Sequence, residues 1–340
     1  MGRNLPTLED VARAAGVSTA TVSRCLNEPG KVSEKTRDHV MQAVSKLNYS
    51  PNFGARAIAA NRTGIFGAVI PTMENAIFAR GIEAFQKSLV EKNGTTLVAS
   101  SAYDPENEAR LIRTMVARGA DGLLLIGTER DPEIYTFLAD RNIPTVIAWA
   151  CSADPNQAYV GFDNRAASER LVAHAIGMGH RTFACISAPT ATNDRARDRV
   201  LGARQAITTA GLDAAAMPIV ETDYSIENGR SAFRQIAATA SLPSLIICGN
   251  DVLAVGAIQA AAAAGLDVPG DVSIIGFDDI ELATVISPAL TTVHVPHREM
   301  GRLAGDTLYS LVKDATEPIR IELETRLVER QSLAAPKPIR

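Results

Sequence analysis

The sequence is poor in cysteine and aromatic residues and lacks long apolar runs. Aromatic residues make up 5% of the 340 residues, and there is one tryptophan. The four cysteines have neither the spacing of metal ligands nor that of a disulfide framework. They are Cys25, Cys151, Cys185 and Cys248. No apolar run reaches the roughly 18 residues that a membrane span needs. We therefore expect a cytoplasmic protein with reduced thiols, no bound metal and no membrane partner.

The chain also lacks the short motifs of common enzymes. It contains no Gly-x-Ser-x-Gly turn, no P-loop, no His-Glu-x-x-His and no Cys-x-x-Cys. Gly177 and Gly179 form a Gly-x-Gly pair, but the third glycine of a dinucleotide fingerprint is missing and the pair precedes a predicted strand. The five histidines are dispersed. We predict that the protein is not an enzyme and binds no cofactor.

Charge is distributed unevenly along the chain. Residues 1–62 contain nine Lys or Arg and five Asp or Glu, which gives +4; the other 25 bases and 33 acids give −8, and the two sum to −4. A small basic segment ahead of a large acidic body favours local binding to nucleic acid. Because +4 also lies within ordinary variation, the asymmetry only supports the motif that follows.

Residues 7–26 have the pattern of a helix-turn-helix. Apolar residues recur at helical spacing on both sides of Gly16, which can adopt the positive φ of a tight corner. Thr7 and Ser18 are placed to cap the two helices. The second helix would present small or hydrogen-bonding side chains to the DNA major groove. They are Thr19, Ala20, Thr21, Ser23 and Arg24. An ordinary αα-hairpin in a helical bundle is the alternative.

A third helix is predicted after Ser33. Its apolar positions are Val40, Ala43, Val44 and Leu47. We therefore assign residues 1–49 to a three-helix DNA-binding domain. Ser50 and Pro51 can begin a further short helix, which is too short to be stable alone. We assign residues 50–62 to a hinge helix or linker.

From Thr63 onward, short apolar runs alternate with amphipathic segments. The predicted strands are 65–70, 96–99, 123–126, 146–148, 183–187, 218–221, 245–248 and 273–277. The predicted helices are 76–92, 106–118, 131–141, 165–178, 198–210, 226–239 and 253–264. This alternation predicts two doubly wound α/β lobes with buried parallel strands.

Polar and aromatic residues follow many of the predicted strands. The stretches are 72–78, 100–103, 127–128, 149, 163, 188–199, 224, 250–251 and 278–279. Because ligands of such sheets bind beyond the carboxyl ends of the strands, these residues are candidates for a cleft that holds a polyhydroxylated ligand. A helix cap or a loop role is the alternative for each of them, Asn250 and Asp278 included.

Three motifs occur together in the head: residues 7–26, residues 31–37 (KVSEKTR), and residues 47–52 (LNYSPN) followed by Ala55-Arg56. This combination resembles the lactose/galactose repressor (LacI/GalR) family of transcriptional regulators. The resemblance implies a homodimer that binds a pseudo-palindromic operator. Base edges would be read by Thr19, Ala20 and Arg24, and Arg24 would contact a guanine because Ala20 offers no hydrogen bond. The other implied DNA contacts are Thr7, Ser18, Thr21, Ser23, Asn27, Tyr49, Asn52, Ala55 and Arg56.

In that family, a hinge helix forms on the operator and an apolar side chain enters the central base step of the minor groove. The matching residue is Ile58, where the family usually has Leu. Ile is β-branched and therefore stiffer at χ1.

Five further motifs extend the resemblance over the body. They are residues 159–164, 179–181, 249–251, 268–279 and 288–292. They are similar to the family's effector domain, whose fold is of periplasmic-binding-protein type. The resemblance implies that residues 63–340 form a two-lobed effector-binding and dimerisation domain with crossings near Gly161, Thr291 and Leu323. Lobe 1 would comprise about residues 63–161 and 292–322, and lobe 2 about 162–291 and 323–335.

The resemblance also implies a set of effector contacts. Arg199, Asn250 and Asp278 match sugar-binding positions, and Tyr224 matches an aromatic that stacks on the ligand. Trp149 stands where many relatives have Asp. The other predicted contacts are Ile77, Phe78, Asp163 and Arg197.

These observations predict a repressor whose operator affinity is controlled by a small metabolite of the sugar or sugar-acid class. A cytoplasmic carbohydrate-binding protein without operator function is the alternative.

Overall fold

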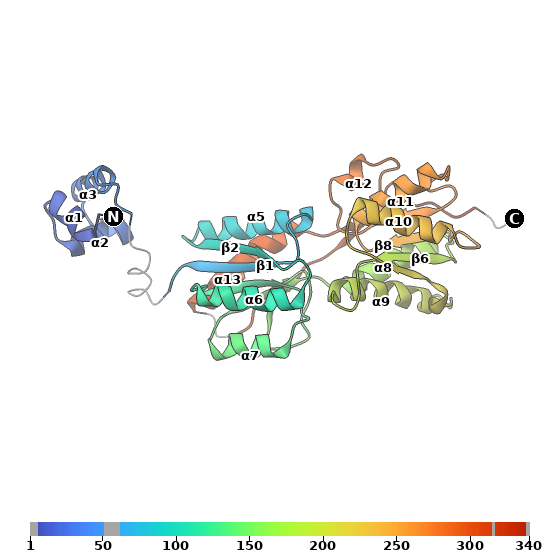
Figure 1. The fold of residues 1–340 in the computed structure, drawn as a ribbon, viewed down its shortest axis with the longest axis horizontal. Helices are drawn as coiled ribbons and strands as arrows, with labels where there is room; N and C mark the ends of the chain where they lie inside the picture. Colours follow the sequence, from blue (N-terminus) through green and yellow to red (C-terminus); the bar gives the residue numbers. More distant parts are fainter. Residues whose placement is uncertain (1–5, 51–61, 315–316, 338–340) are drawn as a thin grey trace. The chain divides into compact units, whose positions relative to one another are not determined.

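The structure is a computed structural model that describes residues 6–50, 62–314 and 317–337 (Figure 1). The chain divides into two compact units, Met1–Thr63 and Gly64–Arg340. Most of the predicted hinge, residues 51–61, lies outside the described residues. The predicted DNA contacts there are Asn52, Ala55, Arg56 and Ile58.

The first unit, which we call the head, contains the three predicted helices. They are α1 (Leu8–Ala14), α2 (Thr19–Asn27) and α3 (Glu34–Lys46), with a short 3-10 helix η1 (Pro29–Lys31) before α3. The predicted caps are confirmed, because the hydroxyls of Thr7, Ser18 and Ser33 accept from backbone N–H groups of the first turns. Gly16 has φ +63° at the corner between α1 and α2. The fully buried residues of the head core are Val11, Val22 and Val40.

The second unit, the body, has two lobes. Lobe 1 is built on a six-stranded parallel sheet with the order β11-β5-β4-β3-β1-β2. Its strands are β1 (Ile65–Ile70), β2 (Thr95–Ser100), β3 (Gly122–Ile126), β4 (Thr145–Ala148), β5 (Ala158–Gly161) and β11 (Arg320–Glu322). Its helices are α5 (Ala76–Val90), α6 (Pro105–Ala117), α7 (Pro132–Asp140) and α13 (His297–Lys313). All five residues of β3 are buried, as expected for a continuous apolar run at the centre of a parallel sheet.

Lobe 2 is built on a four-stranded parallel sheet with the order β7-β6-β8-β9. Its strands are β6 (Phe183–Ser187), β7 (Ile219–Glu221), β8 (Leu245–Cys248) and β9 (Ser273–Ile275). Its helices are α8 (Asn164–Gly177), α9 (Asp194–Thr209), α10 (Ile226–Ala237), α11 (Asp251–Ala263) and α12 (Leu282–Val285), with a 3-10 turn η2 (Ala214–Ala216). Helices α8 and α9 pack together, and so do α10 and α11 (Figure 1). The prediction of two parallel α/β lobes is confirmed.

A short antiparallel ladder lies where the chain passes between the lobes. β10 (Thr292–His294) pairs with β12 (Arg326–Val328), and His294 also bridges Asp278 just beyond β9. We therefore group β10 with lobe 2, whereas the sequence-based boundaries assign residue 292 onward to lobe 1.

The sequence analysis does not predict α13, which packs along α5 in lobe 1. Two glycines allow this close approach: a Cβ on Gly301 would lie 1.9 Å from the carbonyl oxygen of Gly81. A Cβ on Gly81 would lie 2.3 Å from the ring of Trp149. The seam between these helices therefore supports one wall of the cleft described below.

Several predicted boundaries in lobe 2 differ from the observed ones: α10 ends at Ala237 rather than at residue 239, and α11 begins at Asp251 rather than at residue 253. The start of α9 and the end of β9 also differ. Helix α9 begins at Asp194 rather than Asp198, because the Asn193 side chain caps it by accepting from the N–H of Ala196 at 3.3 Å. Strand β9 ends at Ile275 rather than Phe277. From Ile275 onward the backbone forms isolated bridges to Thr291 and His294, and positive φ follows at Asp278 and Asp279, +109° and +55°.

Candidate functional site

The carboxyl ends of the strands in both lobes face a common cleft. Loops after β1, β2 and β4 reach it from lobe 1, and loops after β6, β7, β8 and β9 reach it from lobe 2. This is the position at which parallel sheets bind ligands. The inner part of the cleft is lined by Asn75, Ile77, Phe78, Tyr103, Trp149, Asn193, Arg195, Arg199, Tyr224, Asn250 and Asp278.

Two buried guanidinium groups enter the inner cleft from α9. Arg199 donates through Nη1 to the carbonyl oxygen of Gly249 and through Nε to that of Arg195 at 3.3 Å. Its guanidinium carbon also lies 4.5 Å from the ring centroid of Phe277. Arg195 donates to the Asp194 carboxylate at 2.8 Å. The Arg199 charge is therefore held by carbonyl oxygens and an aromatic ring, whereas that of Arg195 is paired with a carboxylate.

Asp194 joins the two lobes. Its carboxylate accepts from the hydroxyl of Thr128 in lobe 1 at 2.9 Å and from the backbone N–H of the same residue. These hydrogen bonds and the Arg195 guanidinium hold the pKa of Asp194 below its ordinary value despite burial. The carboxylate therefore stays ionised and keeps its contact across the cleft.

Asp278 and Asn250 place polar atoms at the floor of the inner cleft. The Asp278 side chain is buried, and burial raises its pKa to about 7, although Arg199 and Arg195 oppose the rise. Asn250 is 1% exposed and caps α11 through Oδ1, which accepts from the N–H of Leu253 at 2.9 Å. Its Nδ2 has no hydrogen-bond partner among the described residues. A buried amide donor without a partner is costly unless a ligand or water supplies the acceptor.

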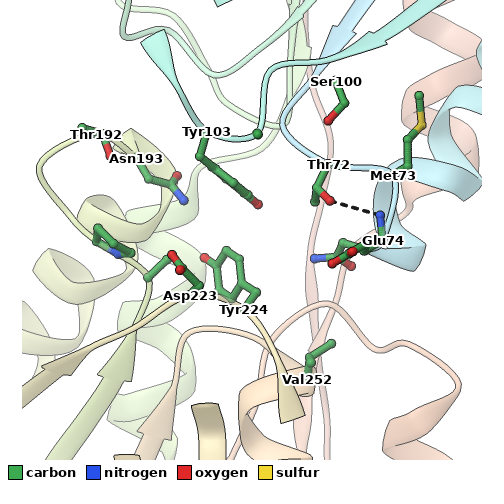
Figure 2. Close-up of a pocket in the computed structure, with 14 residues that line it drawn as sticks. Thr72, Met73, Glu74, Ser100, Tyr103, Thr192, Asn193, Asp223, Tyr224 and Val252 are labelled. Carbon is green, nitrogen blue, oxygen red and sulfur yellow. Dashed lines mark hydrogen bonds between the residues drawn. The ribbon is translucent and has the colours of Figure 1, made fainter. Parts of the chain in front are cut away.

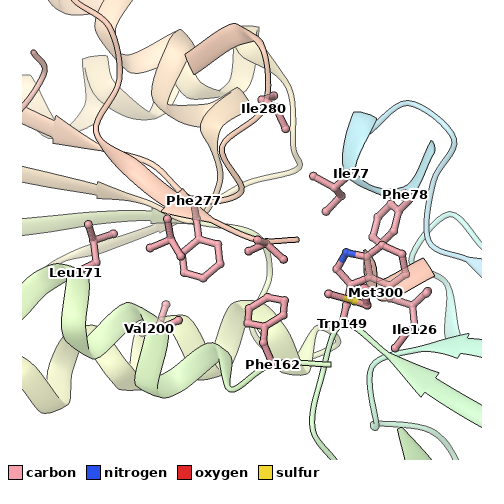
Figure 3. Packing of buried hydrophobic residues seen from close by; sticks show 14 of the residues in the cluster. Ile77, Phe78, Ile126, Trp149, Phe162, Leu171, Val200, Phe277, Ile280 and Met300 are labelled. Atoms are coloured by element: carbon pink, nitrogen blue, oxygen red, sulfur yellow. The ribbon is translucent and has the colours of Figure 1, made fainter. Parts of the chain in front are cut away.

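Trp149 forms the wall of the cleft in lobe 1. Its Nε1 donates to Nδ1 of His297 at 3.1 Å, and Nε2 of His297 lies 3.3 Å from the carbonyl oxygen of Asp278 in lobe 2. Burial lowers the pKa of His297 to about 3, so this imidazole is neutral with its proton on Nε2. Phe78 packs against Trp149 with 5.3 Å between ring centroids, and Ile77 lies beside it (Figure 3). His297 thus connects both walls of the cleft.

The backbone around this cleft is strained. Among the described non-glycine residues with positive φ, three are asparagines, which tolerate this conformation. The others are Ala102, Tyr103, Trp149, Asp278 and Asp279. All five lie in or next to loops that line the cleft. Such strain costs of order 1–3 kcal/mol per residue and collects at functional sites.

Tyr103 and Tyr224 face each other from the two lobes, with 6.1 Å between ring centroids and an interplanar angle of 56°. Both tyrosines also line a cavity of about 680 Å³ (Figure 2). Its lining includes Thr72, Glu74, Asn75, Ser100, Tyr103, Thr192, Asn193, Asp223 and Tyr224. The volume is within the range of small-molecule sites.

Seven of the nine predicted effector contacts gather in the inner cleft. They are Ile77, Phe78, Trp149, Arg199, Tyr224, Asn250 and Asp278. The other two lie elsewhere. Asp163 is exposed and caps α8, accepting from the N–H of Ala166 at 2.9 Å. Arg197 pairs with Glu129 at 2.7 Å. These two side chains have structural roles that spacing along the chain does not reveal.

Four cleft residues are absent from the predicted contacts. They are Asn75, Tyr103, Asn193 and Arg195. Each lies in a stretch that follows a predicted strand, so the position was indicated. Which side chain of each stretch turns inward depends on the local backbone, such as the positive φ of Tyr103, and the type of residue does not predict it.

The predicted DNA-reading side chains lie on α2 of the head. Thr19, Ala20 and Arg24 are exposed, and the Arg24 side chain makes no hydrogen bond or ion pair within the described residues, whereas its backbone carbonyl accepts from the N–H of Glu28. Ser18 is exposed and also forms the cap of α2, with 2.9 Å between its hydroxyl and that of Thr21. Tyr49 is half-buried against the head core. Thr7 is exposed and Ser23 half-buried, and Asn27 is the last residue of α2. An exposed helix face with small side chains and one arginine suits the major groove.

Two further observations bear on function. Among the described residues, no group of three or more His, Cys, Asp or Glu side chains could hold a metal ion. No helix in the described part of the chain is long and apolar enough to cross a membrane.

The comparisons with known proteins agree with this architecture. Residues 7–52 match the family model of bacterial regulatory proteins of the lacI family, and residues 172–333 match that of the periplasmic binding protein-like domain. The chain is 36% identical over 335 residues to the HTH-type transcriptional repressor PurR of Klebsiella pneumoniae (strain 342), covering 97% of each.

Solved structures show the same likeness. A LacI-family transcriptional regulator from Silicibacter pomeroyi superposes with a TM-score of 0.86 at 26% identity, covering 97% of this chain and 99% of that one. The lac repressor dimer bound to operator and the anti-inducer ONPF superposes with a TM-score of 0.87 at 26% identity, with the same coverage. Because these relatives are repressors and regulators, the prediction that the protein is not an enzyme is confirmed. The chain belongs to the lacI family of bacterial regulatory proteins and is a DNA-binding transcriptional repressor of that family.

Proposed function

We propose that the protein is a cytoplasmic homodimer that binds a pseudo-palindromic operator, and that a small metabolite of the sugar or sugar-acid class in the inter-lobe cleft controls operator affinity. The observation that carries the proposal is the cleft itself. Donors and acceptors from both lobes converge there, and the amide donor of Asn250 lacks a partner. Hydroxyl groups of a ligand can pair with the guanidinium of Arg199 and the carboxyl of Asp278.

The ligand acts through the lobes rather than directly on DNA. Trp149 and Asp278 stand on opposite lobes, and His297 touches both. A ligand that fits one arrangement of the lobes better than another shifts the population of arrangements, by no more than its difference in affinity. Operator affinity changes if the arrangement of the lobes favoured by the ligand places the two heads of the dimer in a position less or more suitable for the operator.

Base reading is assigned to α2 of each head. Thr19, Ala20 and Arg24 face base edges, with Arg24 on a guanine, and the remaining predicted contacts lie at phosphates or the central minor groove. The relatives support this assignment, since the lac repressor dimer was solved bound to operator.

DNA binding is tested by fluorescence anisotropy of the full chain on random duplex at two salt concentrations, followed by selection of an operator from a random pool. Phosphate contacts require that affinity fall steeply with salt. Absence of salt-dependent binding would instead support a carbohydrate-binding protein without operator function.

The ligand class is tested by a thermal-shift screen of sugars, sugar acids and nucleobases. Nucleobases belong in the screen because Phe78, Trp149 and Tyr224 offer flat apolar faces. A ligand raises the stability of the state that it binds, and each hit is then tested for its effect on operator affinity. Trp149 is the only tryptophan, so intrinsic fluorescence should change on binding. Asp278→Asn should abolish both effects while leaving operator binding in the absence of ligand intact.

A further inference from the structure

The segment that leads from β10 into α13 is hydrogen-bonded to the turn that carries Asp278. The backbone N–H of Asp278 donates to the carbonyl oxygen of Val293, with 2.9 Å between the nitrogen and the oxygen. The carboxylate of the next residue, Asp279, lies 2.9 Å from Nδ1 of His294. The carbonyl oxygen of Asp278 lies 3.3 Å from Nε2 of His297. These three contacts attach residues 293–297, which pass from lobe 2 into lobe 1, to the turn at residues 278–279.

The hydrogen bonds of His297 fix which of its ring nitrogens carries the proton. The indole Nε1 of Trp149 can only donate, so Nδ1 of His297, at 3.1 Å, is the acceptor. The imidazole is therefore neutral, and its proton lies on Nε2, which donates to the carbonyl oxygen of Asp278. His297 is 4% exposed. If lobe 2 moved away, this buried N–H would lose its acceptor, so the bond favours the arrangement of the lobes in the structure.

Asp278 makes different contacts through its side chain and its backbone. The residue lines the inner cleft, whereas its backbone carbonyl oxygen accepts from His297. Its φ of +109° is uncommon for aspartate, and such a conformation persists only where the surrounding contacts hold it. A ligand that moves the backbone of Asp278 therefore also changes the hydrogen bond to His297.

His297 is also the first residue of α13, and this helix packs tightly along α5. A Cβ on Gly81 of α5 would lie 3.3 Å from the carbonyl oxygen of His297 and 2.3 Å from the ring of Trp149. A Cβ on Gly301 of α13 would lie 1.9 Å from the carbonyl oxygen of Gly81. Because such close packing leaves no space for local adjustment, a displacement of His297 moves α13 and α5 together.

We propose that His297 is a positioning residue that couples the turn at Asp278 to helices α13 and α5 of lobe 1, and that its hydrogen bond to Asp278 stabilises the arrangement of the lobes in which Trp149 is buried. This inference rests on the proposed function of the cleft and adds the bond through which lobe 2 acts on lobe 1. Within the described residues, His297 does not line either cavity of the cleft. It therefore acts through Trp149 and Asp278 and not by contact with the ligand.

Two substitutions at His297 separate its two hydrogen bonds. Asparagine places an oxygen near the position of Nδ1 and can accept from Trp149, but its side chain is too short to reach Asp278. Glutamine extends to the position of Nε2 and can donate to Asp278. His297→Asn should therefore break the contact between the lobes, and His297→Gln should restore part of it.

His180→Asn is the matched control. His180 is 1% exposed and also makes two hydrogen bonds, at 3.0 Å to the hydroxyl of Ser244 and at 2.9 Å to the carbonyl oxygen of Ala334. Both partners belong to lobe 2. This variant removes a buried imidazole and leaves the contact between the lobes intact.

The experiment measures acrylamide quenching of Trp149 fluorescence in the full chain without ligand, at a temperature where circular dichroism shows each variant to be folded. Trp149 is 2% exposed, so quenching increases when the cleft opens. His297→Asn should raise the quenching constant about two- to tenfold, because a hydrogen bond contributes about 0.5–1.5 kcal/mol and 1.4 kcal/mol is tenfold. His297→Gln should raise it less, and His180→Asn should leave it unchanged. Affinity for the selected operator should change by a similar factor in His297→Asn and stay at the parent value in His180→Asn.

The outcomes separate this inference from the proposed function. An equal rise in quenching in His297→Asn and His180→Asn would overturn the inference, because loss of stability would explain both. Unchanged quenching in His297→Asn would also overturn it, and so would a rise in quenching without a change in operator affinity. The proposed function fails independently, if no metabolite of the thermal-shift screen alters the operator affinity of the parent chain.

Discussion

The head and the body present their functional side chains in opposite ways. In the head, Thr19, Ala20 and Arg24 are exposed and lie on one short helix. In the body, Asn250 and Asp278 are buried and follow different strands. A DNA duplex is larger than the head, so it is read from outside by the face of a helix. A small molecule must be enclosed, so its contacts come from several loops.

The two functional surfaces also differ in how much they reduce the stability of the folded protein. In the head, the side chains that cap helices use ordinary hydrogen bonds within one turn. In the body, the cleft brings together positive-φ residues, a carboxyl with a pKa raised to about 7 and an amide without a partner. We infer that a substitution on the DNA-reading face of the head can change DNA binding without changing stability. A substitution in the cleft should change both ligand binding and the stability of the body. Four predictions test this comparison, from the largest expected effect to the smallest.

The largest effect should come from the core of the body. Phe85 on α5 is fully buried in the main core of the body. Phe85→Ala should destabilise the body by about 3–5 kcal/mol, because it removes a buried ring and leaves a cavity. Urea unfolding followed by Trp149 fluorescence reports this transition. Far-ultraviolet circular dichroism after unfolding of the body should still show a helical head, since the head has its own core. Loss of head helicity in the same transition would show that the two units are not independent.

The next effect should be on sequence reading. Arg24→Ala should cost on the order of 1–3 kcal/mol at one base pair of each half-site, because the side chain is exposed and free to contact a base edge. Anisotropy titrations on single-base variants of the selected operator measure it. Thermal stability and the effector-induced change in Trp149 fluorescence should remain as in the parent chain. An equal loss on every sequence would show that Arg24 contacts phosphate.

A smaller effect should distinguish two caps of the same design. Ser18 caps α2 next to Thr21, and Ser33 caps α3 next to Thr36, with 2.9 Å and 2.8 Å between the hydroxyl oxygens. Ser18→Ala and Ser33→Ala should each destabilise the head by about 1 kcal/mol. Only Ser18→Ala should also weaken operator binding in conditions where the head is fully folded, since Ser18 is a predicted DNA contact. The same loss of operator affinity in both variants would reduce the role of Ser18 to capping.

The smallest net effect in the parent chain should be the pH dependence of the body, because His297 and Asp278 give opposing slopes there. Burial lowers the pKa of His297 from 6.5 to about 3. Between these two pH values the unfolded chain binds a proton on this imidazole that the folded chain does not bind, so stability rises with pH. Asp278 has a pKa raised from 3.8 to about 7, so the folded chain holds the extra proton, and stability falls with pH. The two slopes oppose each other where the windows overlap.

Single variants should reveal each slope. Asp278→Asn should leave a stability that rises with pH across the overlap, and His297→Gln should leave one that falls. Urea midpoints of the body, measured through this window, provide the comparison. Identical pH profiles for both variants and the parent chain would contradict the assignment.

Most of the architecture could be predicted from the sequence, because its signals are local. Apolar runs such as that of β3 predict buried parallel strands, and Ser18 and Ser33 predict the starts of helices. Helix α13 was not predicted, although Met300, Ala304 and Leu308 recur at helical spacing on its buried face. Its place beside α5 depends on Gly81 and Gly301, and such a seam joins residues far apart in the chain.

The cleft was predicted by position and only partly by residue. Post-strand stretches indicated the right edge of both sheets, since topology fixes where parallel strands end. Arg197 belongs to the same stretch, 188–199, as the cleft residues Arg195 and Arg199, but its side chain pairs with Glu129. Asp163, also a predicted contact, instead caps α8. Tyr103 turns inward because its backbone has a positive φ, which no local preference of tyrosine predicts.

By itself, the sequence determined that the chain has a helix-turn-helix head and an α/β body, because periodicity, caps and strand runs act over a few neighbouring residues. Only the tertiary structure decided which side chains share the cleft, that Arg199 lacks a carboxylate partner within the described residues, and that a tyrosine from each lobe lines the cavity. Burial, ion pairing and cavity volume depend on residues from both lobes that meet in the folded protein. The spacing of these residues along the chain does not predict them.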